Sequence, residues 1–156
     1  MKCVGVIGVG SSLGADNIAE LVVERLKWHL RYYRLKNKIQ VAYYDRPGVY
    51  LLELIKYFKV VHFIDAIVSG KPLGYIHSYD DIASFQKSNR LLSSHGFGLV
   101  EGLQLGEALG CLPDRIVIHG IEIDNENPFN PTAECLIRAS DNLAVQMRKE
   151  IINYFC

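Results

Sequence analysis

A short apolar segment that ends in closely spaced glycines and leads into a helix constrains this fold most. Residues 2–10 read KCVGVIGVG, glycines stand at positions 8, 10 and 14, and a helical pattern begins near Asp16. An apolar strand followed by a glycine turn and a helix is typical of the first unit of a parallel α/β sheet. Ligands of such sheets bind at the carboxyl ends of the strands. We therefore expect residues 8–17 to border a functional site.

The rest of the chain alternates strand and helix patterns. Strands are predicted over 39–44, 60–66, 74–79 and 113–123, and helices over 16–35, 49–58, 97–109 and 132–155. The segment 74–79 is expected beside the third strand, as an antiparallel edge. This order predicts a single α/β domain over residues 1–156, with three layers: a twisted, mostly parallel five-stranded sheet and helices on both of its faces.

Composition narrows the class of partner. The 17 basic and 17 acidic residues cancel, which gives no indication of a nucleic-acid or membrane-surface partner. The four cysteines lack the spacing of a metal site and are expected to be reduced thiols. No apolar stretch is long enough for a membrane span, so a cytoplasmic protein is expected.

Polar residues interrupt apolar elements at three places where strand ends and helix starts should meet. They are Asp16 and Asn17 after the first strand, Asp65 near the end of the third, and His95 before a helix. Taken singly, each fits a helix cap or a turn. Taken together, carboxylate and amide oxygens with an imidazole suit a first-row transition metal. A carboxylate at the end of a buried strand also requires a partner or a function.

The remaining histidines have a simpler interpretation. His62 and His119 fall inside predicted strands, where a hydrogen-bonded structural histidine is the usual case, and neither they nor His29 and His77 are expected to be ligands. The predicted helix 97–109 has a glycine at every fourth position (98, 102 and 106). Each glycine costs about 1 kcal/mol relative to alanine, so this face is expected to lie close to another backbone.

A second interpretation is a small nucleotide-binding domain. Gly8, Gly10 and Gly14 after a strand, with Asp45 at the end of the next strand, imitate a dinucleotide fingerprint. The glycines would admit a pyrophosphate and Asp45 would bind a ribose hydroxyl. Asp16 would repel the phosphate, so this interpretation ranks below the metal site.

Four segments, in order along the chain, resemble one known family. Residues 8–17 (GVGSSLGADN), 63–66 (FIDA), 93–99 (SSHGFGL) and 112–122 (LPDRIVIHGIE) are similar to motifs of the nickel–iron hydrogenase maturation endopeptidases, and residues 45–48 resemble a further turn more loosely. These peptidases remove a C-terminal extension from the hydrogenase large-subunit precursor once nickel has been inserted.

The resemblance implies a site and a partner. Asn17, Asp65 and His95 would contact nickel supplied by the substrate, Asp65, His95 and Asp16 would be catalytic, and no permanent metal is expected. The partner would be the large-subunit precursor. The family has a carboxylate where this chain has Asn17, so a homologue that binds the precursor without cutting it is the alternative.

Overall fold

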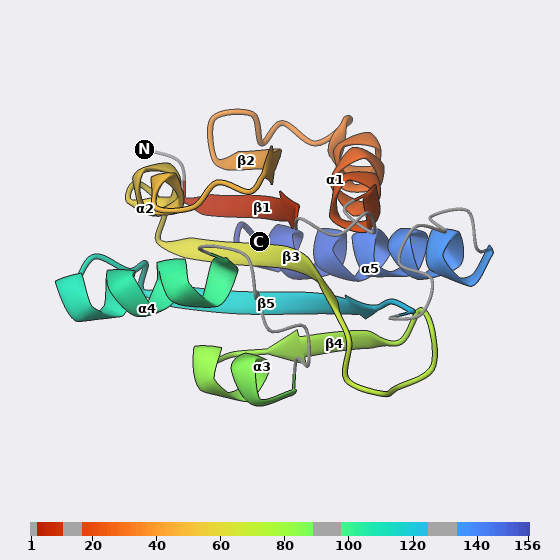
Figure 1. Ribbon diagram of the computed structural model, residues 1–156. Coiled ribbons are helices and arrows are strands. Elements are labelled where there is room, and N and C mark those ends of the chain that lie inside the picture. The colour runs from red at the N-terminus through yellow and green to blue at the C-terminus, as the bar shows by residue number, and fades with distance from the viewer. Residues whose placement is uncertain (1–2, 11–16, 89–97, 125–133) are drawn as a thin grey trace.

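A computed structural model of the chain describes residues 3–10, 17–88, 98–124 and 134–156. The strands are β1 (Val4–Gly10), β2 (Ile39–Asp45), β3 (Val60–Ile67), β4 (Ile76–Tyr79) and β5 (Arg115–Glu122). The helices are α1 (Asn17–Leu30), α2 (Tyr50–Ile55), α3 (Ile82–Ser88), α4 (Leu99–Leu109) and α5 (Glu134–Asn153) (Figure 1). Each predicted strand and helix is confirmed with shifted ends, and α3 lies in a region for which no element was predicted.

The five strands form one sheet in the order β2-β1-β3-β5-β4, as predicted for a mostly parallel α/β fold. β1, β2, β3 and β5 are parallel, and β4 is the antiparallel edge. The expectation that β4 pairs with β3 is wrong, because β5 lies between them. β5 is buried along most of its length and requires a neighbour on each side, whereas the short, half-exposed β4 suits an edge.

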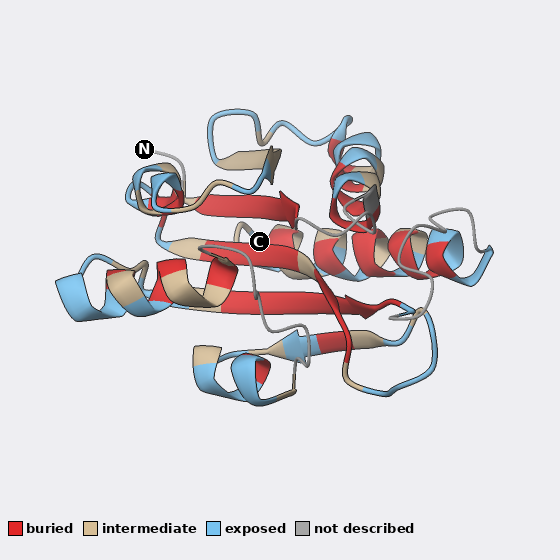
Figure 2. Cartoon of the chain, viewed as in Figure 1, coloured by how far each residue is buried: buried red, intermediate tan, exposed pale blue. Residues whose placement is uncertain are grey.

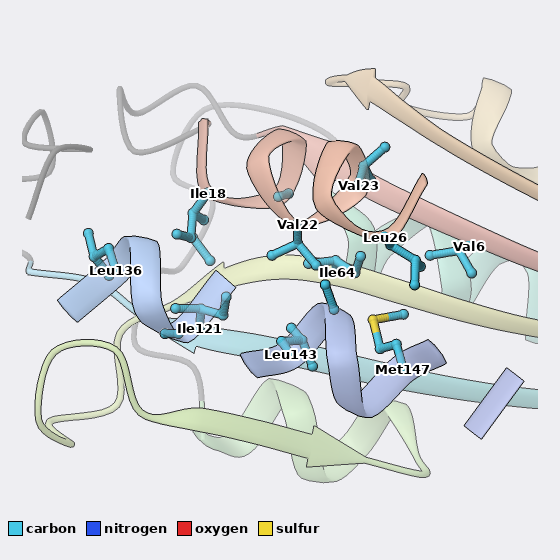
Figure 3. Close-up of a cluster of buried hydrophobic side chains, with 14 of the residues drawn as sticks. Val6, Ile18, Val22, Val23, Leu26, Ile64, Ile121, Leu136, Leu143 and Met147 are labelled. Atoms are coloured by element: carbon cyan, nitrogen blue, oxygen red, sulfur yellow. The ribbon is translucent and has the colours of Figure 1, made fainter. Parts of the chain in front are cut away.

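Helices pack on both faces of the sheet, and β1, β3 and β5 are buried along most of their length (Figure 2). The apolar residues form two separate clusters, one on each face. α1 and α5 cover one face, where Val22, Leu26, Leu143 and Met147 pack against strand residues such as Ile64 (Figure 3). The helices α2, α3 and α4 cover the opposite face. Among the described residues, no helix is long and apolar enough to cross a bilayer.

The close approach of α1 to β1 depends on Gly8. A Cβ atom at this position would lie 2.8 Å from Val23 Cγ2 and 3.1 Å from the Ala19 carbonyl oxygen, both on α1. Real Cβ atoms do not tolerate the first of these distances, so the absent side chain lets the helix lie directly on the strand. The start of α1 is thereby held near the carboxyl end of β1.

The glycine face of α4 has a different neighbour from the one expected. A Cβ at Gly106 would meet the side chains of Leu112, at 2.5 Å, and Leu52, at 2.8 Å. The expectation of a neighbouring backbone is therefore wrong at this position, and two leucines fill the space. Gly110 ends α4 in the left-handed conformation, with φ of 64°, as its place after the last helical residue predicts.

Candidate functional site

The carboxyl ends of β1 and β3 lie side by side at the point where the chain changes direction across the sheet. From β1 the chain passes through α1 to β2 on one side, and then returns to β3 on the other side. In open α/β sheets this switch point is where ligands bind. The strand order thus brings together the two parts of the predicted site region, which are the carboxyl ends of the central strands β1 and β3.

Asp65 lies near the carboxyl end of β3, opposite Gly120 of β5. Alternation along the strand puts it on the same face as Phe63 and Ile67, whose side chains belong to the core under α2, α3 and α4. Its side chain is partly buried, and Oδ1 accepts a hydrogen bond of 2.8 Å from the Ala66 amide. This local bond holds the carboxylate at the carboxyl end of β3.

The other predicted site residues are only partly covered by the structure. Asp16 and His95 lie outside the described residues, and Asn17 opens α1 but its side chain lies outside them too. Residues 89–97, which contain His95, connect α3 to α4, and both helices pack on the face that carries Asp65. The meeting of Asp16, Asn17 and His95 with Asp65 therefore stays a prediction.

Asp45, the residue that the nucleotide interpretation required, is engaged by its neighbour. It is the last residue of β2 and pairs in register with Gly10. Both of its carboxylate oxygens accept hydrogen bonds of 3.3 Å from the Arg46 guanidinium. A ribose hydroxyl would have to compete with this ion pair for the carboxylate.

A buried carboxylate network that the sequence analysis missed lies at the end of β5. Glu122, only 2% exposed, accepts hydrogen bonds from the Ser69 amide and hydroxyl, both at 2.7 Å, and from the Gly70 amide at 3.0 Å. His77 Nε2 lies 2.8 Å from the same carboxylate, and His77 Nδ1 lies 3.0 Å from the Tyr79 hydroxyl. The network fixes the turn after β3 against β4 and β5.

Burial raises the pKa of the Glu122 carboxyl, but the hydrogen bonds from Ser69, His77 and Gly70 together outweigh it, and the net pKa lies below its usual value. The carboxylate is therefore charged at neutral pH. Glu122 interrupts the apolar run 116–123 in the sequence, and a charged residue inside a buried strand requires partners. That interruption was the signal available without a structure.

Two buried histidines form a second polar cluster on the α5 face of the sheet. His62 Nδ1 lies 3.0 Å from His119 Nε2, and both side chains are fully buried. Burial lowers the pKa of each ring to about 4, and for His62 the neighbouring His119 adds to this effect. The expectation that these strand histidines are hydrogen-bonded is confirmed.

The sequence comparison decides the family. The model of the hydrogenase maturation protease family HycI matches residues 22–150. This chain belongs to the hydrogenase maturation protease family. A curated relative of this chain is the hydrogenase expression/formation protein HupD of Thiocapsa roseopersicina, which is 25% identical over 153 residues, covering 96% of this chain and 67% of HupD.

Solved structures of two members of this family agree with the fold of this chain. The [NiFe] hydrogenase maturation protease HycI of Thermococcus kodakarensis superposes with a TM-score of 0.69 at 23% identity, covering 95% of this chain and 91% of that one. The hydrogenase maturating endopeptidase HybD of E. coli gives a TM-score of 0.72 at 23% identity, covering 96% and 93%. The predicted fold class and the predicted family resemblance are both confirmed.

Proposed function

We propose that this maturation protease removes the C-terminal extension of a nickel–iron hydrogenase large-subunit precursor and recognises the precursor by the nickel already inserted in it. The observation that carries the proposal is the position of Asp65, a carboxylate at the switch point of a sheet that belongs to this family. Asn17 and His95 are the other proposed contacts to nickel, and Asp16, Asp65 and His95 are the proposed catalytic residues.

The donor types suit the proposed cargo. One carboxylate, one amide oxygen and one imidazole form a mixed oxygen and nitrogen set, which first-row transition metals accept. A unit charge about 4 Å from another contributes about 4 kcal/mol at an effective dielectric constant near 20, and a divalent ion doubles this. Desolvation of the carboxylate offsets a large part of that attraction. Asp65 therefore supplies the main electrostatic contribution in this set.

The test compares cleavage of nickel-loaded and nickel-free precursor by the purified chain. We expect a shortened large subunit only with the nickel-loaded form, and a loss of at least about a hundredfold in Asp65→Asn, because the charge that faces the ion disappears. Asp114→Asn is the matched control, since Asp114 is an exposed aspartate just before the amino end of β5. Asp65, in contrast, lies near the carboxyl end of β3. Equal cleavage of both precursors, or an unchanged rate in Asp65→Asn, would contradict the proposal.

One sequence observation favours a second function, binding of the precursor without cleavage. Asn17 places a neutral amide where the resemblance leads us to expect a carboxylate. The variant Asn17→Glu separates the two functions. If only Asn17→Glu cleaves the precursor, and the natural chain binds the precursor as tightly as Asn17→Glu does, the natural chain is a binding homologue. If the natural chain already cleaves, the binding-only alternative is rejected.

A further inference from the structure

Two histidines and one glutamate converge on the face of the sheet covered by α5. His62 Nδ1 and His119 Nε2 are 3.0 Å apart, and Glu150 Oε2 on α5 lies 3.9 Å from each of these nitrogens. The three atoms come from β3, β5 and α5. His62 lies three residues before Asp65 in β3, so alternation puts the two side chains on opposite faces of the sheet.

The spacing of these atoms matches a metal-ion site. A point equidistant from three atoms separated by 3.0, 3.9 and 3.9 Å lies about 2.1 Å from each of them. Zinc binds imidazole nitrogen at about 2.0–2.1 Å and carboxylate oxygen at about 2.0–2.2 Å. An ion at this point would lie within bonding distance of all three atoms and in the plane that they define.

The outer ring nitrogens have the partners that metal-binding histidines use. His62 Nε2 lies 3.2 Å from the Tyr154 hydroxyl, and His119 Nδ1 lies 3.0 Å from the Ser78 hydroxyl. When each outer nitrogen donates its proton to a hydroxyl, both inner nitrogens present lone pairs to the same point.

The surroundings provide charge and access. Glu150 brings a negative charge, and its side chain is 36% exposed, so an ion can enter from the surface of α5 although both rings are fully buried. Arg115 is a positive charge close enough to act on His62. Its guanidinium lies 5.9 Å from the Tyr154 ring and 3.9 Å from the Asp80 carboxylate, which offsets part of its repulsion of a cation.

We propose that His62, His119 and Glu150 form a binding site for a resident divalent ion of the zinc class, separate from Asp65. Two imidazoles and one carboxylate are a donor set that zinc accepts, with one coordination position left for water. The bound ion would join α5 to β3 and β5. This proposal goes beyond the processing function and departs from two expectations drawn from the sequence, that the protein has no permanent metal and that His62 and His119 are not ligands.

The experiment measures metal binding by the full-length chain, stripped with a chelator and titrated with cobalt chloride and zinc chloride. All samples carry Asp65→Asn, which removes the negative charge from the other proposed metal-contacting set (Asn17, Asp65 and His95) and makes the result independent of precursor cleavage. We expect one equivalent of cobalt, with visible d–d absorption and without the intense near-ultraviolet band of thiolate ligation. That absorption pattern excludes the four cysteines as ligands.

Variants of the cluster decide between a metal site and a simple hydrogen-bonded pair. Glu150→Gln keeps the size of this part-exposed side chain and removes its charge, and it is expected to weaken cobalt binding at least about tenfold. Ser78→Ala removes the hydroxyl partner of His119 and is expected to weaken cobalt binding about tenfold. Glu134→Gln, an exposed carboxylate on the same helix, is the matched control and should bind as the parent does.

Two outcomes would overturn the proposal. One is failure of the Asp65→Asn parent to bind cobalt or zinc, which would leave His62 and His119 as a hydrogen-bonded pair. The other is binding of equal strength in Glu150→Gln and in the parent, which would place the ion elsewhere. Neither outcome bears on whether the natural chain cleaves a precursor, so the processing function is tested separately.

Discussion

Mild acid should destabilise this protein because His62 and His119 are neutral and buried. The pKa of each ring in the folded chain is about 4, against an ordinary value of 6.5. Between pH 6.5 and pH 4 the unfolded chain therefore binds protons that the folded chain does not. Their contribution to stability is complete above pH 6.5 and is lost as the pH falls toward 4. The prediction concerns the metal-free chain, kept in a chelator.

The size of the effect follows from the two pKa values. For one ring, the linkage relation gives a loss of about 2 kcal/mol in the free energy of unfolding between pH 7 and pH 5. Two rings that both stay neutral would give about 4 kcal/mol. A domain of this size has a typical stability of about 5–15 kcal/mol, so the change is a large share of the total. The cost arises because a charged imidazole would be fully buried beside a second ring.

Urea unfolding at a series of pH values between 7 and 5 measures this loss, and the midpoint should fall steadily. NMR titration of the imidazole resonances checks the cause. A constant free energy of unfolding over this range, or rings of His62 and His119 that titrate near pH 6.5, would refute the reasoning.

Two further substitutions test the packing and the buried carboxylate. Gly8→Ala should lower the free energy of unfolding by about 1–3 kcal/mol, because the added Cβ would lie 2.8 Å from Val23 Cγ2. Adding Val23→Ala to the same chain should relieve part of that cost, as measured by a thermal or urea melt. Glu122→Gln should cost about 1–3 kcal/mol, because the amide has one acceptor oxygen where both oxygens of the carboxylate accept hydrogen bonds. The matched control Glu107→Gln, on the exposed side of α4, should leave the urea midpoint unchanged.

The order of strands and helices could be predicted because it depends on local patterns. Alternating apolar runs and glycine turns marked β1, β2, β3 and β5, and Gly110 marked the end of α4. The neighbour of β4 could not be predicted this way. In the folded sheet β5 pairs with β3, so β4 can pair only with the free side of β5. This pairing depends on the assembly of the whole sheet and not on the local sequence of β4.

Of the polar residues at the ends of the strands, some could be predicted from the sequence and others could not. Asp65 could be found because a carboxylate at the end of an apolar strand is conspicuous in the sequence, and the strand order then placed it at the switch point. The partners of Glu122 could not be found, since Ser69 and His77 follow β3 and reach β5 only through the folding of the sheet. Contacts between residues so far apart in the chain leave no periodic signal.

The sequence by itself determined that this chain forms a parallel α/β sheet, and its motifs determined the family, because strand and helix periodicity and short motifs are local properties of the chain. Only the tertiary structure decided that His62, His119 and Glu150 meet within 3.9 Å. The physical reason is that the register of β3 against β5 and the docking of α5 set those distances, and both result from packing of the whole core.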